Sequence, residues 1–340
     1  MKVLVTGHRG FIGTVMVPML LKEGFEVVGL DSDLYRFCTF GEEPVTVPSI
    51  VKDVRKIEKQ DLEGFDAIVH LAALSNDPLG NINPDLTYDI NWRASVRIAE
   101  MAREVGVKRF LFASSCSMYG KAGDDVLDET AEFNPVTPYA KSKVYVERDV
   151  APMATDSFSP VFLRNATAYG FSPRIRFDLV INNLTAWALT TGKILMKSDG
   201  TPWRPLVHIE DISQAVICAL QAEQEVIHNL AVNVGDNNEN YQMRDLAKFV
   251  KEVVGNCDID YADDAGPDLR CYRASFDKIH QVFPNFKTRW TAKQGVAQCF
   301  EAYKKFGLKK DDYEGVKYKR IVHILNLIEE GKLDKDLFWQ

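Results

Sequence analysis

A tyrosine and a lysine, Tyr139 and Lys143, stand four residues apart in the chain. In a helix this spacing puts both side chains on one face. A free tyrosine has a pKa of about 10 and is a poor base at neutral pH. A neighbouring ammonium favours the phenolate and brings that pKa toward the range that general-base catalysis needs. The pair could therefore take a proton from a hydroxyl group, although the same pattern is also common on helix surfaces.

Three glycines, Gly7, Gly10 and Gly13, follow an apolar run at residues 2–6 and open a helical pattern. This spacing tightens the turn, lets the backbone approach a pyrophosphate and points a helix N-terminus at the anion. The loop therefore predicts a dinucleotide site, to which Phe11 and Ile12 also belong.

Asp31 ends the second apolar run, where a carboxylate would accept hydrogen bonds from the hydroxyls of an adenosine ribose. The same charge repels a 2′-phosphate, so NAD is favoured over NADP. Arg9, inside the glycine loop, is the residue that could instead reach a 2′-phosphate.

The elements that must position these residues alternate along the N-terminal half. Strands are expected at residues 2–6, 26–30, 67–71 and 108–113, and helices at residues 11–23, 84–105 and 138–153. This alternation predicts a Rossmann-type, doubly wound parallel sheet of the α/β class. The texture changes after about residue 165, so we expect an NAD-binding domain at residues 1–165. A smaller C-terminal α/β substrate lobe at residues 166–340 would partly interleave with it.

Together, the glycine loop, Tyr139-x-x-x-Lys143 and the segment SSCSMYG at residues 114–120 resemble the extended short-chain dehydrogenase/reductase family. The nucleotide-sugar epimerase/dehydratase branch is the more similar part of that family. Further matches are residues 53–55, residues 70–73, Asn91 and the segment WRPLVHIEDI at residues 203–212. The resemblance covers roughly residues 1–300, and the last 40 residues match no pattern that we can assign.

The resemblance implies roles for individual residues. Its catalytic residues fall on Tyr139, Lys143 and Ser115. Its cofactor contacts, besides the glycine loop, Asp31, Tyr139 and Lys143, fall on Asp53, Val54, Leu71, Ala72, Ala73 and Asn91. Its substrate contacts fall on Ser115, Ser117, Tyr139, Asn183, Arg204 and Arg270. Asn76 and Asp77 could also touch a sugar, but a turn before Pro78 explains them equally well.

The residues after Ser115 bear on the type of reaction. In this family, enzymes that eliminate water usually carry Asp-Glu there, and decarboxylating relatives usually keep a Glu, whereas this chain has Cys116 and Ser117. The resemblance therefore implies an NAD-dependent 4-epimerase that works through a 4-keto sugar. A lowered pKa at Cys116 would weaken that prediction by providing a base. The alternatives are a nucleotide-sugar ketoreductase, a dehydratase and a non-catalytic dinucleotide-binding protein.

Composition excludes some partners. The 340 residues carry a net charge of −7, the reverse of what a nucleic-acid binder shows. Apolar stretches are too short to span a membrane, and the six cysteines lack the spacing of a zinc site or disulfide framework, so no metal is expected. The start of the chain reads as a strand rather than a signal peptide, which predicts a cytoplasmic protein.

The resemblance also implies a homodimer that pairs the helices at residues 84–105 and 138–153. Ile98, Met101, Val144 and Val150 on these helices would suit such a contact, but they would equally suit a core stripe.

Overall fold

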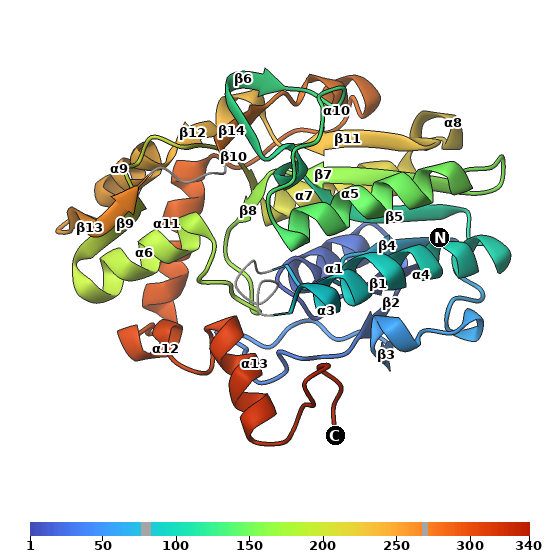
Figure 1. Ribbon diagram of the computed structural model, residues 1–340, viewed down its shortest axis with the longest axis horizontal. Helices are drawn as coiled ribbons and strands as arrows, with labels where there is room; N and C mark the ends of the chain where they lie inside the picture. Colours follow the sequence, from blue (N-terminus) through green and yellow to red (C-terminus); the bar gives the residue numbers. More distant parts are fainter. Residues whose placement is uncertain (76–82, 267–270) are drawn as a thin grey trace.

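One parallel sheet organises the molecule (Figure 1). The computed structural model describes residues 1–75, 83–266 and 271–340, and within them this sheet has seven strands. The strands are β1 Lys2–Thr6, β2 Glu26–Asp31, β3 Ser49–Val51, β4 Ala67–His70, β5 Arg109–Ser115, β7 Ser159–Asn165 and β11 Leu230–Val234. Their order is β11-β7-β5-β4-β1-β2-β3.

The strand order reverses between β1 and β4. The chain goes from β1 outward to β2 and β3, then crosses back and builds the other half of the sheet from β4. Ligands of open α/β sheets bind at such a switch point, outside the carboxyl ends of the strands. The strands are apolar on both sides, as Val3, Leu4 and Val5 illustrate, because helices cover both faces. The predicted doubly wound α/β fold is confirmed.

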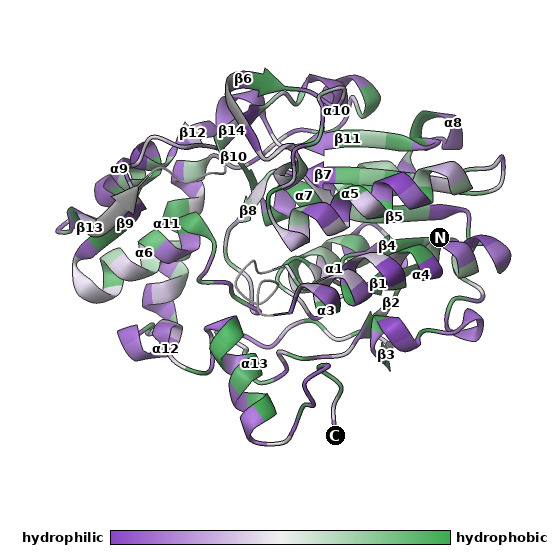
Figure 2. Ribbon diagram, viewed as in Figure 1, coloured by the Kyte–Doolittle hydropathy of each residue, from purple (hydrophilic) through white to green (hydrophobic). Residues whose placement is uncertain are grey.

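Two hydrophobic clusters lie on the two faces of this sheet. On one face, α1 Gly13–Lys22 and α7 Ile209–Gln221 pack on Val3, Val5 and Val69. On the other face, α4 Ala94–Glu104 and α5 Pro138–Val150 pack on Leu4 and Ile68. Figure 2 shows hydrophobic colours concentrated in the sheet and in α1.

The helix expected at residues 84–105 is interrupted. It consists of α3 Pro84–Tyr88, a π-helical turn at Asp89–Arg93 and α4. Such π-turns are frequent at functional sites, and this one carries Asn91. Ile98, Met101 and Val150 lie in the core, so the core interpretation of these residues is the correct one.

Three small sheets and further helices form the rest of the molecule, many of them gathered at one end of the central sheet (Figure 1). The small sheets are β12-β10-β8, β13-β9 and β14-β6, built from β6 Lys121–Leu127, β8 Thr167–Tyr169, β9 Lys193–Ser198, β10 Trp203–His208, β12 Asn240–Gln242, β13 Asp258–Gly266 and β14 Cys271–Ala274. The remaining α-helices are α6 Val180–Thr191, α8 Gln224–Ile227, α9 Met243–Val254, α10 Asp277–Val282, α11 Ala292–Lys305, α12 Lys310–Glu314 and α13 Arg320–Glu329. Short 3₁₀ turns are η1 Val54–Lys56, η2 Lys59–Asp61, η4 Cys116–Tyr119, η5 Ala151–Met153 and η6 Asn237–Glu239. Among all described helices, none has the length and apolar character needed to cross a membrane.

The C-terminal residues, which resemble no motif in the sequence, return to the β2 side of the central sheet. Ile324, Leu327, Leu333 and Leu337 join the cluster under α4 and α5. The indole N–H of Trp339 donates to the carbonyl of Ser32, just after β2, at 2.7 Å. The chain end is therefore part of the fold of the first lobe.

A buried ion pair connects α5 to β7. The Arg164 guanidinium contacts the Glu147 carboxylate at 2.7 Å, and the two side chains are only 6% and 7% exposed. Ser114, at the end of β5, donates to the same carboxylate at 2.6 Å. This network holds the carboxyl end of β5 against the helix that carries Tyr139 and Lys143.

We expect Glu147→Gln to reduce the free energy of unfolding by about 3–5 kcal/mol, because it leaves a buried guanidinium without a counter-charge. The matched control is Glu252→Gln, since Glu252 pairs with Lys293 at the same 2.7 Å but with both side chains about half exposed. It should cost less than about 1 kcal/mol. Denaturant unfolding measures both values, and equal losses would contradict the assignment of a structural role to the buried pair.

Candidate active site

A cavity of about 1190 Å³ lies at the carboxyl ends of the central strands. It is lined by loops after β1, β2, β4 and β5, by α5, and by α6, β9 and β10 from the other part of the chain. Single-ligand sites usually measure roughly 300–1,000 Å³. This cavity therefore has room for a dinucleotide and a second ligand.

The glycine loop closes one side of this cavity. Gly7 has φ +74°, and a Cβ on it would lie 2.7 Å from the Ala72 nitrogen. A Cβ on Gly13 would lie 2.5 Å from the carbonyl oxygen of Gly7. Both positions need glycine, and Gly10, Phe11 and Ile12 line the same wall. The loop thus forms the close backbone cradle that a pyrophosphate requires, and the residues fit a bound dinucleotide.

Asp31 lies where the ribose contact is expected. Its carboxylate lines the cavity and accepts the backbone N–H groups of Arg9 at 2.9 Å and Asp33 at 2.8 Å. Burial raises its pKa. The Arg9 guanidinium pairs with the Asp33 carboxylate, so its charge is already neutralised. The loop arginine is therefore held by a carboxylate, which favours NAD over a cofactor with a 2′-phosphate.

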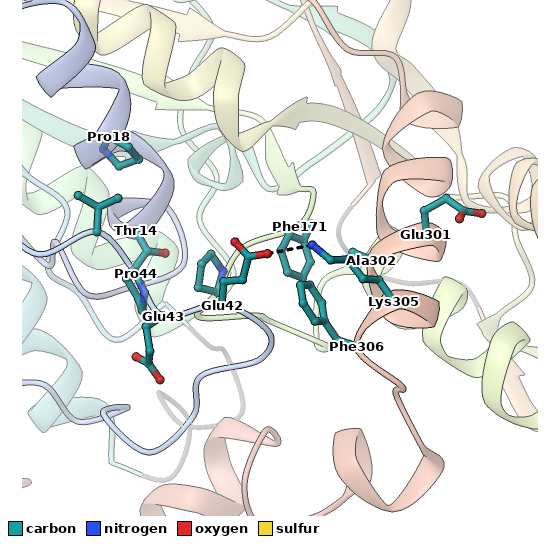
Figure 3. Close-up of a pocket in the computed structure, with 12 residues that line it drawn as sticks. Thr14, Pro18, Glu42, Glu43, Pro44, Phe171, Glu301, Ala302, Lys305 and Phe306 are labelled. Carbon is teal, nitrogen blue, oxygen red and sulfur yellow. Dashed lines mark hydrogen bonds and ion pairs between the residues drawn. The ribbon is translucent and has the colours of Figure 1, made fainter.

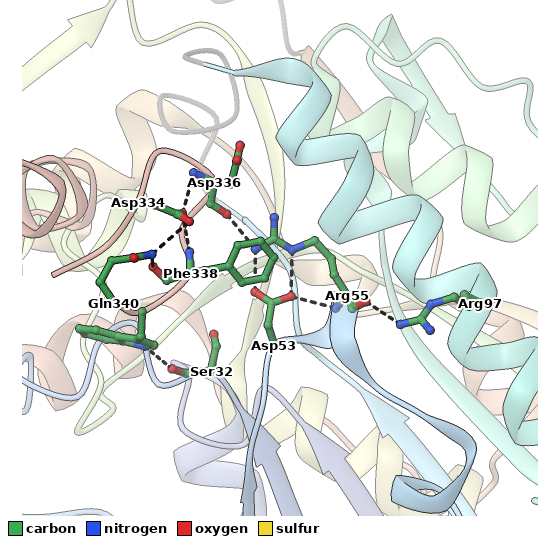
Figure 4. A network of polar contacts seen from close by, with 9 residues as sticks. Ser32, Asp53, Arg55, Arg97, Asp334, Asp336, Phe338 and Gln340 are labelled. Carbon is green, nitrogen blue, oxygen red and sulfur yellow. Dashed lines mark hydrogen bonds and ion pairs between the residues drawn. The ribbon is translucent and has the colours of Figure 1, made fainter. Parts of the chain in front are cut away.

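Asp53 and Val54 line the cavity where η1 begins. The Asp53 carboxylate accepts two guanidinium hydrogen bonds from Arg55, at 2.9 and 2.8 Å. Arg55 also donates to the carbonyl of Asp336 and lies 3.8 Å from the ring centre of Phe338 (Figure 4). The C-terminal residues thus support this wall.

Leu71, Ala72 and Ala73 line the cavity after β4. Asn91 is buried behind them and does not line it. Its side-chain oxygen accepts from the Leu74 N–H at 2.7 Å, and its N–H groups donate to the Leu74 carbonyl and the Ser142 hydroxyl. Asn91 therefore connects the β4 loop to α5, so that any effect of Asn91 on the cofactor acts through this loop.

Tyr139 and Lys143 lie on the first turns of α5, which begins after Thr137. The Thr137 hydroxyl oxygen accepts the Ala140 N–H, which caps the helix. Lys143 is buried, and its ammonium donates to the Ala113 carbonyl at 2.6 Å and lies 5.5 Å from the Tyr139 ring centre. Burial lowers the pKa of Lys143 to about 7. Both side chains line the cavity, as the proposed proton transfer requires.

Ser114, Ser115 and Ser117 line the cavity beside them, whereas Cys116 does not. The Ser115 hydroxyl accepts the Ser117 N–H at 3.1 Å. The Ser117 hydroxyl is buried without a hydrogen-bond partner in the described chain, so a bound ligand could satisfy it.

Cys116 points into the core. Its thiol donates to the Arg164 carbonyl at 3.1 Å, and burial raises its pKa. A thiol with a raised pKa is a poor base, so Cys116 lacks the property that would have favoured another reaction.

In the other wall, Asn183 and Arg204 line the cavity as expected. The Asn183 amide donates to the Phe177 carbonyl at 2.8 Å, and Arg204 donates to the Trp203 carbonyl at 2.9 Å. Arg270, Asn76 and Asp77 lie outside the described residues.

The cavity also contains an ion pair and a further arginine that were not predicted from the sequence. Arg176 contacts Asp178 at 2.6 Å and donates to Ser75. Burial opposes the charge on Asp178, but the Arg176 guanidinium outweighs it and lowers the pKa to about 2. Charged residues that alternate with Ile175 and Phe177 could have indicated this pair. Arg320, the first residue of α13, also lines the cavity, and no motif marks it.

A second cavity, of about 570 Å³, lies between α1 and α11 (Figure 3). Its wall includes Pro18 and Phe306, and Lys305 spans it to Glu42 at 2.9 Å. It contains none of the predicted catalytic, cofactor or substrate residues. Elsewhere in the described residues, no three His, Cys, Asp or Glu side chains group as a metal site would require.

Known proteins share this architecture. The chain is 26% identical to a UDP-glucose 4-epimerase of Cyamopsis tetragonoloba, which covers 89% of this chain and 93% of the relative. It is 25% identical to a dTDP-D-glucose 4,6-dehydratase of Mus musculus, over 89% of each chain. Among solved structures, MoeE5 in complex with UDP-glucuronic acid and NAD is 26% identical, with a TM-score of 0.78 over 90% of this chain and 99% of that one.

A family model described as "NAD dependent epimerase/dehydratase family" matches residues 3–235. That match contains the glycine loop, Asp31, Ser115, Tyr139 and Lys143. Since the match spans more than half of the chain and the cavity fits a dinucleotide, this protein is an enzyme of the NAD-dependent epimerase/dehydratase family, with NAD as its cofactor.

Proposed function

We propose that this enzyme is a nucleotide-sugar 4-epimerase. The observation that carries the proposal is the set of side chains around one cavity: Tyr139, Lys143, Ser115 and Ser117 face the same space as the glycine loop. Bound NAD supplies a hydride acceptor and donor there. The protein's own residues then handle the proton and hold the sugar.

In the first half of the proposed cycle, Tyr139 removes the proton of the C4 hydroxyl. The buried ammonium of Lys143, near the Tyr139 ring, favours the phenolate. Ser115 donates a hydrogen bond to the same sugar oxygen. The 4-keto sugar then rotates so that its other face is reduced. Tyr139 returns the proton, and C4 has the opposite configuration.

The surroundings of Ser115 favour epimerisation over elimination. Elimination needs a further acid or base for a carbon-bound proton. The two residues after Ser115 provide none, because Ser117 is a hydroxyl and Cys116 is a buried thiol with a raised pKa. Asp178 is held by Arg176. A dehydratase is the alternative, and the similarity to a mouse dehydratase supports it. A ketoreductase has less support, since Asp33 neutralises Arg9.

The proposed substrate is a sugar linked to a nucleoside diphosphate. Asn183 and Arg204, which line the same cavity as Tyr139, would bind its diphosphate. UDP-glucose and UDP-glucuronic acid are the first candidates. One relative is a UDP-glucose 4-epimerase, and one similar structure contains UDP-glucuronic acid. Arg270 stays a candidate for the same role.

We further propose that residues 1–165 bind the cofactor and that residues 166–340 form a substrate lobe that partly interleaves with them, since β11 and the last residues of the chain return to the first sheet. The proposed homodimer would use the outer face of α3 to α5, where Tyr88 and Trp92 are half-buried neighbours. A cytoplasmic location is consistent with six free cysteines.

Tyr139→Phe should lower kcat by a factor of about 10²–10⁴, because the hydroxyl that carries the proton is lost. The Kd for NAD should change less than about threefold, since little packing volume is removed. Tyr145→Phe is the matched control, on the same helix but packed against Trp92 and outside the cavity. Steady-state kinetics with UDP-glucose or UDP-glucuronic acid, and NAD titration, measure both. Full activity of Tyr139→Phe would refute the assignment.

In heavy water, the product should be a stereoisomer of the substrate that contains no carbon-bound deuterium, because the hydrogen at C4 leaves and returns as a hydride. Mass spectrometry and proton NMR of the reaction with catalytic NAD test this. A product lighter than the substrate by the mass of one water, as elimination gives, would favour the dehydratase. Stoichiometric consumption of a reduced cofactor would favour the ketoreductase.

A further inference from the structure

Positive charge gathers beside the cavity where the C-terminal helix α13 begins. Arg320 lies on the cavity wall, with its guanidinium 4.2 Å from the ring centre of Tyr35. It donates to the Arg174 carbonyl at 3.4 Å. Within the described residues, no carboxylate lies within ion-pair distance of Arg320. The Asp178 carboxylate acts on this charge from beyond that distance, so Arg320 has no direct counter-ion in the described part of the chain.

The neighbouring groups do not supply the missing anion. Asp178 interacts electrostatically with Arg320, but its direct ion pair, at 2.6 Å, is with Arg176. Arg174 is 6% exposed and donates to the Thr39 hydroxyl, but its Nε is buried without a partner. A buried cation without a counter-charge is costly. Arg320 lines the cavity without a direct counter-ion, and Arg174 is hydrogen-bonded to it, which points to an anionic ligand at this end of the cavity.

The fold brings this cluster close to the glycine loop. Ser172, just before Arg174, donates to the Phe11 carbonyl at 2.8 Å. Phe11, Ile175 and Tyr318 belong to one hydrophobic cluster, so the loop that carries Arg174 and the segment that leads into α13 pack together beside the glycine turn. Tyr35, under Arg320, follows the Asp31 strand end. The nearest expected anion is therefore the diphosphate of the dinucleotide.

We propose that Arg320 binds the diphosphate of NAD together with the glycine loop, so that the C-terminal helix forms part of the cofactor site. The glycine loop offers backbone N–H groups, and Arg320 offers a guanidinium fork that suits phosphate oxygens. The family model ends at residue 235, and no motif of the sequence assigns this residue.

The residues after α13 continue along the cofactor wall toward the place expected for the adenosine of the dinucleotide. Trp339 donates to the Ser32 carbonyl, and Phe338 packs on Arg55, the partner of the cavity-lining Asp53 (Figure 4). Residues 320–340 therefore contact both the middle and the end of the cofactor wall. An enzyme that regenerates its cofactor in each cycle benefits from such retention, although the binding of NAD by Arg320 does not depend on the epimerase assignment.

The test is the affinity of cofactor-free protein for three probes, measured by titration calorimetry: NAD, adenosine, which lacks the diphosphate, and UDP. Arg320→Leu should raise the Kd for NAD about 10- to 100-fold, as expected for loss of a charge-assisted contact. The Kd values for adenosine and UDP should stay within threefold. Arg320→Lys should recover part of the NAD affinity. The matched control is Arg103→Leu on α4, an exposed arginine that should leave all three unchanged.

Each other outcome overturns the proposal in a recognisable way. An unchanged Kd for NAD with a raised Kd for UDP would assign Arg320 to the diphosphate of the substrate. Equal losses for NAD and adenosine, together with a lower melting temperature of the cofactor-free protein, would assign it to folding only. Unchanged affinities for all probes would show that Arg320 binds no ligand. None of these results depends on turnover. A failure of this proposal would therefore leave the epimerase assignment and its own tests unaffected.

Discussion

The close approach of two backbone turns at the switch point of the sheet determines the rest of the site. Gly7 turns with φ +74°, at a distance from Ala72 that leaves no space for a side chain. This contact brings the loop after β1 and the loop after β4 to one wall, with the start of α1 directed at the space between them. The dinucleotide cradle follows from that geometry.

The reacting side chains are held against this wall by polar contacts in a buried environment. Lys143 donates to the Ala113 carbonyl, which ties α5 to β5, and Ser114 and Arg164 hold the same helix through Glu147. Because these partners are buried, small rotations of α5 would break several hydrogen bonds together. Tyr139 thereby keeps a defined place beside Ser115. The buried contacts of α5 therefore determine the position of Tyr139, the proposed base.

The sequence predicted the parts of this site that depend on local pattern. The glycine spacing, Asp31 and the Tyr139–Lys143 pair each follow from short-range geometry, and all of them line the cavity. The directions in which the Asn91 and Cys116 side chains point were not predictable from local pattern, because they depend on packing between distant elements. The place of Arg320 at the cavity was even less predictable, since α13 reaches the cofactor wall only through long-range contacts of the C-terminal residues with β2. The helix expected at residues 84–105 was correct in extent, but the π-turn within it was not predictable from periodicity.

The account depends most on the proposal that NAD bound in this one cavity would take a hydride from the sugar and return the same hydride within a cycle. A crossover experiment tests it most directly: a nucleotide sugar with deuterium at C4 is mixed with the same sugar that carries ¹³C in its nucleoside and hydrogen at C4. After many turnovers, mass spectrometry of both isomers should find deuterium only in molecules without ¹³C. Deuterium in ¹³C-labelled molecules, or its loss to solvent, would contradict the account.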